Sequence, residues 1–318
     1  MEEPDCLAER FEEHRSRLRA VAYRMLGSTS EADDAVQEAW ILLSRSNADE
    51  IANLGAWLVT VVGRVALNML RSRKTRREEP LDAHLPDPIV DRADGIDPEQ
   101  EAMLADSVGL ALFVVLETLT PAERLAYVLH DMFSVPFDEI AAILDRSPEA
   151  ARQLASRARR RIRGANTTPD ADPGAQKEVV QAFLAAARDG DFDALVAVLD
   201  PDVVLREDWG RGRIVEVRGA QNVARRAKAA SQLDLVVRPA FVNGAAGWVS
   251  LRDGKPFAVA ALTLQHGRIT TMDILLDPVR LARLDLTALD PRPGHSANKA
   301  VRSAGHLSYI GPGRRAPM

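Results

Sequence analysis

Residues 137–163 have the sequence FDEIAAILDRSPEAARQLASRARRRIR, and this stretch decides the fold of the middle of the chain. Apolar side chains recur every three or four residues on both sides of a short polar break. Ser147 can cap a helix whose first position is Pro148, a residue favoured there. The spacing predicts a short helix over 137–144, a tight turn and a longer cationic helix, which is the helix-turn-helix arrangement.

The second of these helices has a polar face suited to DNA. A helix-turn-helix places the start of its second helix in the major groove, where Arg and Gln can pair with base edges. Later arginines suit phosphates. The residues predicted to contact DNA are Glu149, Arg152, Gln153, Ser156, Arg157 and Arg160. A basic helix on an ordinary protein surface is the plainer alternative, and the motif alone does not distinguish a repressor from other DNA-binding proteins.

A second basic helix is predicted upstream, over 54–74. Its apolar residues follow helical spacing and form one buried stripe. The opposite face carries Thr60, Arg64, Asn68 and Arg71, and the segment continues into four more cations before the first acid, Glu78. The alternative is a solvated face whose basic end complements the helix dipole.

An acidic helix is predicted before the basic one, with Ser30 as its N-cap. Apolar residues such as Val36 and Leu43 should face inward. The polar face then carries Asp33, Asp34, Gln37 and Glu38. An ordinary capped surface helix would look the same.

The composition limits the remaining possibilities. The 318 residues carry a net charge of −5, so any nucleic-acid contact must come from local basic patches rather than from the overall charge. One cysteine allows neither an intrachain disulfide nor a Cys-rich zinc site. No apolar run approaches the roughly 20 residues that span a bilayer. We therefore expect a soluble, cytoplasmic protein without a metal, a cofactor or a membrane partner.

The last third of the chain has a different pattern. Two helices are followed by short alternating strands, and Asp253-Gly254 and His266-Gly267 suit hairpin turns. Asp208, Asp273 and His266 are the nominal candidates for a general acid or base. Surface or turn positions are the favoured explanation for all three, and we expect no enzyme activity.

Together, these segments resemble the bacterial extracytoplasmic-function (ECF) sigma factors. Residues 31–40, EADDAVQEAW, resemble the helix of region 2 that binds the polymerase clamp. Residues 55–71 resemble the helix that follows the −10 recognition loop. Residues 119–127 and 137–144 resemble region 4, which recognises the −35 element. Arg152 stands where the family usually has Lys, and Leu154 stands where Arg is common.

The resemblance implies a sigma factor that binds the RNA polymerase core and promoter DNA and directs promoter-specific initiation. Its clamp contacts would be the acidic face at 33–38. Its −10 contacts would be Thr60, Arg64, Asn68 and Arg71, and residues 44–54 would hold a base flipped from the melted strand. Its −35 contacts would be the six residues of the second basic helix.

The last third resembles the SnoaL-like cone domain and the extension of one ECF subgroup. Residues 84–88 (HLPDP), 208–213 (DWGRGR) and 277–281 (DPVRL) resemble that subgroup's Leu-Pro-Glu-Pro, Asp-Gly-Gly-Gly-Arg and Asn-Pro-Asp-Lys-Leu motifs. Trp209 and Arg211 replace small residues of the second motif. The candidate pocket or regulatory residues are Asp208, Trp209, Arg213 and Asp277.

The predicted fold is therefore multidomain, with two all-α sigma domains followed by an α+β SnoaL-like cone domain. The expected divisions are region 2 at 1–77, an acidic Pro-containing linker at 78–107, region 4 at 108–165, the cone at 175–286 and a disordered tail at 287–318. A fused domain that regulates the sigma factor, with no separate anti-sigma factor evident, is the preferred function. The alternatives are a one-component repressor with a cone-fold ligand sensor, or a DNA-binding fusion to a cyclase- or isomerase-like enzyme domain.

Overall fold

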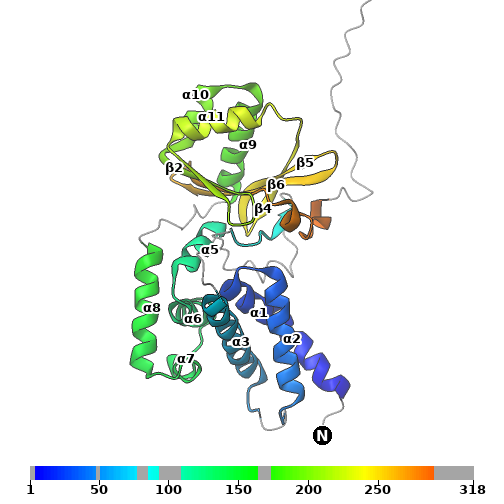
Figure 1. Ribbon diagram of the computed structural model, residues 1–318, viewed down its shortest axis with the longest axis vertical. Coiled ribbons are helices and arrows are strands. Elements are labelled where there is room, and N and C mark those ends of the chain that lie inside the picture. The colour runs from blue at the N-terminus through cyan, green and yellow to red at the C-terminus, as the bar shows by residue number, and fades with distance from the viewer. Residues whose placement is uncertain (1–3, 48–50, 77–84, 93–108, 164–172, 290–318) are drawn as a thin grey trace, which may run out of the picture.

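The computed structural model describes residues 4–47, 51–76, 85–92, 109–163 and 173–289. Figure 1 shows a helical part below and a curved sheet with its own helices above. The expected fold class, helical domains followed by an α+β domain, is confirmed. The helices of the lower part are α1 (Pro4–Leu26), α2 (Thr29–Ser44), α3 (Leu54–Arg76), α5 (Gly109–Thr118), α6 (Pro121–Tyr127), α7 (Phe137–Leu144) and α8 (Pro148–Arg163).

One hydrophobic core runs through all of these helices. It extends from Phe11 in α1 to Ala158 in α8, so the two halves of the helical part are packed against each other. Gly63 in α3 marks their close approach, because a Cβ there would lie 3.1 Å from Leu129 Cδ1. Helix α5 is apolar nearly all round, since Leu112 and Leu116 enter this core whereas Leu110 enters another one beneath the sheet.

The helix that precedes α7 changes its geometry in its last turn. Helix α6 begins with a capping box, in which Thr120 and Glu123 bond reciprocally. After Tyr127 the backbone widens into a π-helix, Val128–Met132. Val128 and Leu129 are both buried in this turn, so packing against the rest of the core outweighs the regular helical geometry.

The upper part is built on one seven-stranded sheet of order β1-β4-β5-β6-β7-β2-β3. Its neighbours are antiparallel except for β2 and β7, which are parallel. The strands are β1 (Val90–Arg92), β2 (Leu199–Asp208), β3 (Ile214–Arg218), β4 (Val236–Val242), β5 (Ala245–Arg252), β6 (Lys255–Gln265) and β7 (Arg268–Leu275). The turns predicted at Asp253-Gly254 and His266-Gly267 both have positive φ angles, as tight hairpins require.

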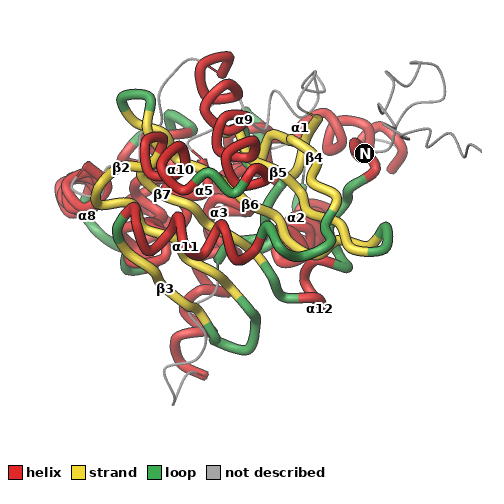
Figure 2. The backbone as a smooth tube through the Cα atoms, turned by 90° about the horizontal axis from the view of Figure 1, so that it is seen from above, coloured by secondary structure: helices red, strands yellow, loops and turns green. Residues whose placement is uncertain are grey.

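Helices cover both faces of this sheet, as Figure 2 shows from above. Helices α9 (Pro173–Asp189), α10 (Phe192–Val198) and α11 (Ala220–Ala230) pack on the concave face. Helix α5 and the short α12 (Pro278–Leu281) lie against the other face, and a 3-10 turn (Thr287–Leu289) follows. Because successive strand residues face opposite sides, Ala260 belongs to the concave core and Ala261 to the core beneath the sheet.

Strand β1 comes from the segment between the two helical halves. Its residues pair antiparallel with β4, and Val90 lies opposite Val242. Val90 is buried in the core beneath the sheet. A piece of the predicted linker is therefore part of the C-terminal sheet.

By length and hydropathy, one helix among the described residues could cross a membrane, the Leu54–Arg73 part of α3. Half of that stretch is buried inside the protein. Leu58, Val62 and Ala66 lie fully within the helical core, which accounts for the apolar composition of the helix.

Candidate functional site

Helix α2 presents the predicted acidic face. Asp33, Asp34, Gln37 and Glu38 are all exposed, whereas the alternating apolar residues are buried. Asp33 accepts a hydrogen bond from Arg19 Nε at 2.7 Å, and the other three remain directed to solvent. The four side chains therefore form one continuous polar surface.

The prediction of Ser30 as the N-cap of this helix is wrong. The helix begins at Thr29, with Ser28 at the N-cap position, and Ser28 makes no side-chain capping bond. The free Thr29 N–H instead donates to Asp87 Oδ2 at 3.1 Å. A carboxylate from the linker thus satisfies the helix terminus and lies at the positive end of its dipole.

The four residues predicted for −10 contacts share one face of α3 but differ in exposure. Arg64, Asn68 and Arg71 are exposed, whereas Thr60 is half-buried. The Thr60 hydroxyl lies 3.5 Å from Glu139 Oε2 in α7, which places this end of the face against the second half of the helical part. Residues 48–50 of the segment expected to hold a flipped base lie outside the described residues.

The predicted −35 surface is brought together on α8. Ala151, Leu154, Ala155 and Ala158 are buried. The exposed face carries the predicted residues Glu149, Arg152, Gln153, Ser156, Arg157 and Arg160. The expected cap is present, since Ser147 Oγ accepts from Ala150 N at 3.2 Å.

A stack of rings orients the first arginine of α8. The His130 and Phe137 rings are stacked with centroids 3.8 Å apart, and the Arg152 guanidinium lies 5.6 Å from the Phe137 centroid. Other α8 arginines serve packing, since Arg159 pairs with Asp131 at 2.5 Å and Arg161 with Glu123 at 3.0 Å. Some arginines of α8 are therefore held in ion pairs within the protein, and the others are exposed on the outer face of the helix.

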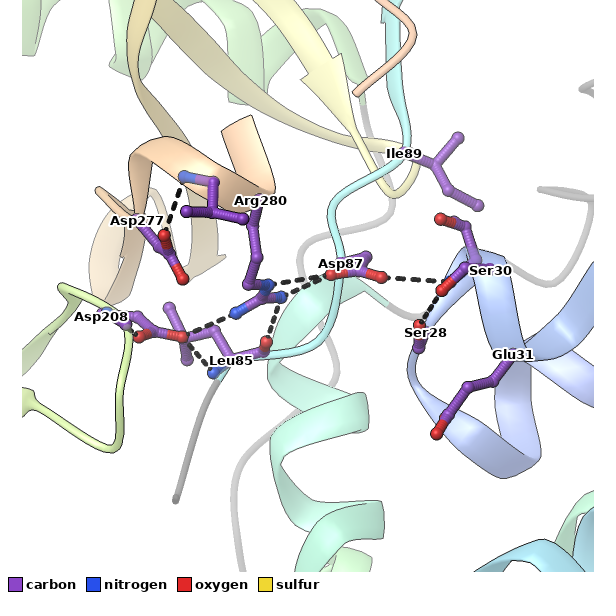
Figure 3. A network of polar contacts seen from close by, with 12 residues as sticks. Ser28, Ser30, Glu31, Leu85, Asp87, Ile89, Asp208, Asp277 and Arg280 are labelled. Carbon is purple, nitrogen blue, oxygen red and sulfur yellow. Dashed lines mark hydrogen bonds and ion pairs between the residues drawn. The ribbon is translucent and has the colours of Figure 1, made fainter. Parts of the chain in front are cut away.

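A polar clasp holds the linker to the C-terminal domain; we define it as Leu85, Asp87, Asp208 and Arg280 (Figure 3). Arg280 of α12 donates to Asp87 Oδ1 through Nε at 2.9 Å and through Nη2 at 2.7 Å. Its Nη1 donates to Asp208 Oδ2 at 2.8 Å. The Leu85 backbone is bound at both ends, since its N–H donates to Asp208 Oδ2 at 2.7 Å and its carbonyl accepts from Arg280 Nη2.

The clasp is largely buried, and hydrogen bonds satisfy its charged groups. Asp208 is fully buried, and Arg280 and Asp87 have side-chain exposures of 15% and 18%. Two carboxylates face one guanidinium, and backbone N–H groups of Leu85, Gly210 and Thr29 supply the remaining donors. Breaking such a buried group leaves an uncompensated charge, at a cost of roughly 3–5 kcal/mol.

A second contact joins three parts of the chain through Asn243, at the β4–β5 turn. Asn243 Oδ1 accepts from Ile89 N at 3.1 Å, and Asn243 Nδ2 donates to the Tyr23 hydroxyl oxygen at 2.8 Å. The Tyr23 hydroxyl in turn donates to the Asp87 carbonyl. The linker therefore lies between α1 and the C-terminal sheet.

The four predicted regulatory residues lie near the clasp but have unequal parts in it. Asp208 is central, whereas Asp277 caps α12 by accepting from Val279 N at 2.9 Å. A Cβ at Gly210, whose φ is positive, would lie 2.3 Å from Asp277 Oδ2, so this close approach requires glycine. Trp209 is partly exposed, with the Arg213 guanidinium 5.5 Å from its ring centroid.

The three nominal acid–base residues do not form a common site, and the expectation of surface or turn positions is wrong for Asp208 and Asp273, which are buried in strands. Asp208 belongs to the clasp, and His266 lies in the β6–β7 turn. Burial raises the pKa of the Asp273 carboxyl, although Arg206 opposes this through charge and a 2.6 Å hydrogen bond. Within the described ranges no group of three or more His, Cys, Asp or Glu side chains could hold a metal ion.

Comparison with known proteins identifies the class. Residues 10–76 match the family model Sigma-70 region 2, and residues 110–162 match Sigma-70, region 4. The chain belongs to the ECF RNA polymerase sigma factors, which bind core polymerase and promoter DNA to initiate transcription.

The relatives include two proteins of Mycobacterium tuberculosis. The chain is 43% identical to the ECF RNA polymerase sigma factor SigJ over 68% of this chain and 70% of that protein. It is 35% identical to a protein described as "Probable ECF RNA polymerase sigma factor SigI" over 88% of this chain and 97% of the relative. The crystal structure of SigJ matches with a TM-score of 0.70 and 34% identity, over 88% of this chain and 99% of that one. The match includes the SnoaL-like domain, so the expected family and extension are confirmed.

Sequence reasoning missed four residues that hold the domains together: Tyr23, Asp87, Asn243 and Arg280. Asp87 and Arg280 lie inside the segments 84–88 and 277–281 that matched subgroup motifs, but only Asp277 was selected from them. Asn243-Gly244 is a typical hairpin-turn dipeptide and could have been noticed as such. Nothing local in the sequence marks Tyr23.

Proposed function

We propose that the polar faces of α2, α3 and α8 carry this sigma factor's clamp, −10 and −35 contacts, and that its SnoaL-like domain restrains them. The main support for the second part is that the linker segment Leu85–Arg92 is bound to the C-terminal domain. This segment bonds to the C-terminal domain through the clasp and β1, and to the region 2 helices through Tyr23 and Thr29. A domain attached in this way acts directly on the segment that sets the separation of regions 2 and 4.

Promoter geometry requires those regions to separate. The −10 and −35 elements lie about 25 base pairs apart, or roughly 85 Å at about 3.4 Å per base pair. Regions 2 and 4 here share one core, and α3 spans only about 35 Å at about 1.5 Å per residue. The arrangement is therefore a closed form, and binding to both elements favours an open one.

The clasp stabilises the closed form because its bonds join different domains. Opening would expose the buried Asp208 charge and the Leu85 side chain, of which 1% is exposed in the closed form. Polymerase and promoter binding must supply this free energy, since a ligand shifts an equilibrium only by its differential affinity for the two states. The SnoaL-like domain then sets how much binding free energy polymerase and promoter must supply before regions 2 and 4 separate.

This role needs no catalysis by the C-terminal domain. Asp208 is occupied by structural bonds, and the Asp273 carboxylate is bound by Arg206. The same role suits a cytoplasmic protein that requires no separate anti-sigma factor, because the covering domain is part of the chain.

In-vitro transcription with core polymerase and the full chain tests the restraint. Arg280→Met breaks the clasp, whereas Arg283→Met, an exposed position on the following turn, provides the matched control. At limiting sigma factor we expect more promoter-dependent transcript from Arg280→Met than from wild type, and no change from Arg283→Met. Equal yields from the two variants, with both shown to be folded by circular dichroism, would refute the restraint.

A further inference from the structure

The concave side of the SnoaL-like sheet encloses a cavity of about 490 Å³. Strands β2, β5 and β7 form its floor, α9 and α11 form its walls, and the α11–β4 connection lies at its mouth. Cavities of this size accommodate small organic molecules. The cavity lies on the sheet face opposite the clasp, and none of the contacts described above uses it.

Most of the lining is apolar. Phe183, Leu205, Trp248 and Met272 are buried and form the inner surface. At the mouth, Leu233 and Val237 are 43% and 40% exposed. An apolar interior with an exposed apolar rim favours a hydrophobic occupant.

One polar side chain inside the cavity lacks a partner. Ser250 on β5 is 4% exposed and lines the cavity. Its hydroxyl has no hydrogen-bond partner in the part of the chain that the structure describes. The Ser250 hydroxyl is not one of the enclosed polar atoms without a partner, so it is accessible from the cavity and can bond to a molecule there.

Two charged residues of the lining, Glu207 and Arg226, form an ion pair with each other. Arg226 of α11 donates to both carboxylate oxygens of Glu207, through Nε at 2.9 Å and through Nη2 at 2.5 Å. The hydrogen bond with Glu207 raises the pKa of Arg226 above its ordinary value. The inner end of the cavity therefore offers no unpaired charge, and the remaining charged residue of the lining, Arg188, is exposed.

We propose that this cavity binds a largely apolar small molecule whose inner end is uncharged and presents one hydroxyl or carbonyl group to Ser250. The volume, the apolar lining, the unpartnered hydroxyl and the internal ion pair together define that chemistry. An anionic group at that inner end would lie beside the Glu207 carboxylate, which is 8% exposed and already bound by Arg226.

Strand β2 connects this cavity to the clasp. Glu207 points into the cavity, and the next residue, Asp208, points to the other face and holds Leu85 and Arg280. A molecule that moves β2 or α11 thus changes the position of Asp208. This second consequence rests on the proposed restraint, whereas binding itself does not.

Binding can be measured with prodan (6-propionyl-2-dimethylaminonaphthalene), an uncharged fluorophore with one carbonyl group. We expect saturable binding to the full chain, with a blue-shifted emission. Ala227→Phe fills the cavity and should weaken binding at least about tenfold, whereas Ala229→Phe, exposed on the same helix and outside the lining, should not. Ser250→Ala should weaken it about three- to tenfold.

A substitution at the mouth of the cavity provides a second test in case Ala227→Phe disturbs folding. Leu233→Arg should weaken prodan binding, and Val236→Arg, 60% exposed and outside the lining, should leave it unchanged. Absence of saturable binding, or equal binding by Ala227→Phe and Ala229→Phe, would overturn the site. Saturable binding that leaves transcript yield unchanged would overturn the link through β2, while the Arg280→Met result separately decides the restraint.

Discussion

Asn243 donates its side-chain amide to the Tyr23 hydroxyl oxygen across 2.8 Å, although the two residues are 220 positions apart in the chain. Both are buried. Burial raises the pKa of the Tyr23 phenol far above its ordinary value, so the hydroxyl keeps its proton and donates it to the Asp87 carbonyl. One chain of hydrogen bonds thus joins the C-terminal domain, region 2 and the linker.

Tyr23→Phe should therefore destabilise the protein. Removing the hydroxyl leaves the Asn243 amide and the Asp87 carbonyl without their partner, at a cost of about 1–3 kcal/mol. Urea unfolding monitored by circular dichroism measures the loss. Tyr127→Phe is the control, since no hydrogen bond of its hydroxyl is found among the described residues, and an equal loss in both variants would contradict the assigned role.

Arg152→Ala and Gln153→Ala should each weaken holoenzyme binding to the −35 element by about 1–3 kcal/mol and relax base preference there. Both side chains are exposed on the α8 face. Arg160→Ala should weaken binding to all sequences alike and reduce the salt dependence. Fluorescence anisotropy with native and altered −35 duplexes distinguishes the two patterns, and an Arg152→Ala loss that is independent of sequence would refute base recognition.

Gly63→Val should favour separation of regions 2 and 4. The added Cβ would lie 3.1 Å from Leu129 Cδ1, and such overpacking costs about 1–3 kcal/mol. Small-angle X-ray scattering should then show a larger radius of gyration. Gly63→Ala adds one carbon and should give a smaller change, so a value for the Val variant identical to wild type would count against a closed form held at this contact.

Lowering the pH should reduce the stability that Glu123 contributes at the start of α6, in region 4. Burial opposes the charged form, but hydrogen bonds from Thr120 and the nearby Arg161 and Arg157 outweigh it, and the pKa of Glu123 lies below its ordinary value. An acid with a lowered folded-state pKa stabilises the protein above its unfolded pKa of about 4.3 and loses that contribution as the pH falls through the folded value.

The stability difference between wild type and Glu123→Gln should accordingly shrink as the pH is lowered below about 4.3. Chemical unfolding at a series of pH values measures it. Glu149→Gln provides the control, because this exposed carboxylate pairs only at the surface with Arg152. A difference that stays constant with pH would show that Glu123 contributes no charge-dependent stability.

The local features of this fold followed from the sequence because short-range patterns determine them. The 3.6-residue spacing of Ala151, Leu154 and Ala158 predicts which side of α8 is exposed. The predicted cap of α8, Ser147, is also present. Turn dipeptides such as Asp253-Gly254 likewise predict the hairpins.

The contacts between domains could not be predicted in the same way. Asp87 resembles any acid of a polar linker until the fold brings Thr29 and Arg280 to it. The same holds for Val90, which lies in the predicted linker but pairs with β4. Such roles depend on partners far away in the chain, which periodicity and composition do not encode.

The edge position of β1 has a consequence for the open form. While Val90–Arg92 is paired, it covers the Ala240–Val242 end of β4. Its departure would leave those backbone N–H and C=O groups without partners at an apolar sheet edge, where extended segments of other molecules can add. Release of the linker is therefore also a hazard for aggregation, and a short-lived open state that polymerase captures quickly would keep the protein monodisperse.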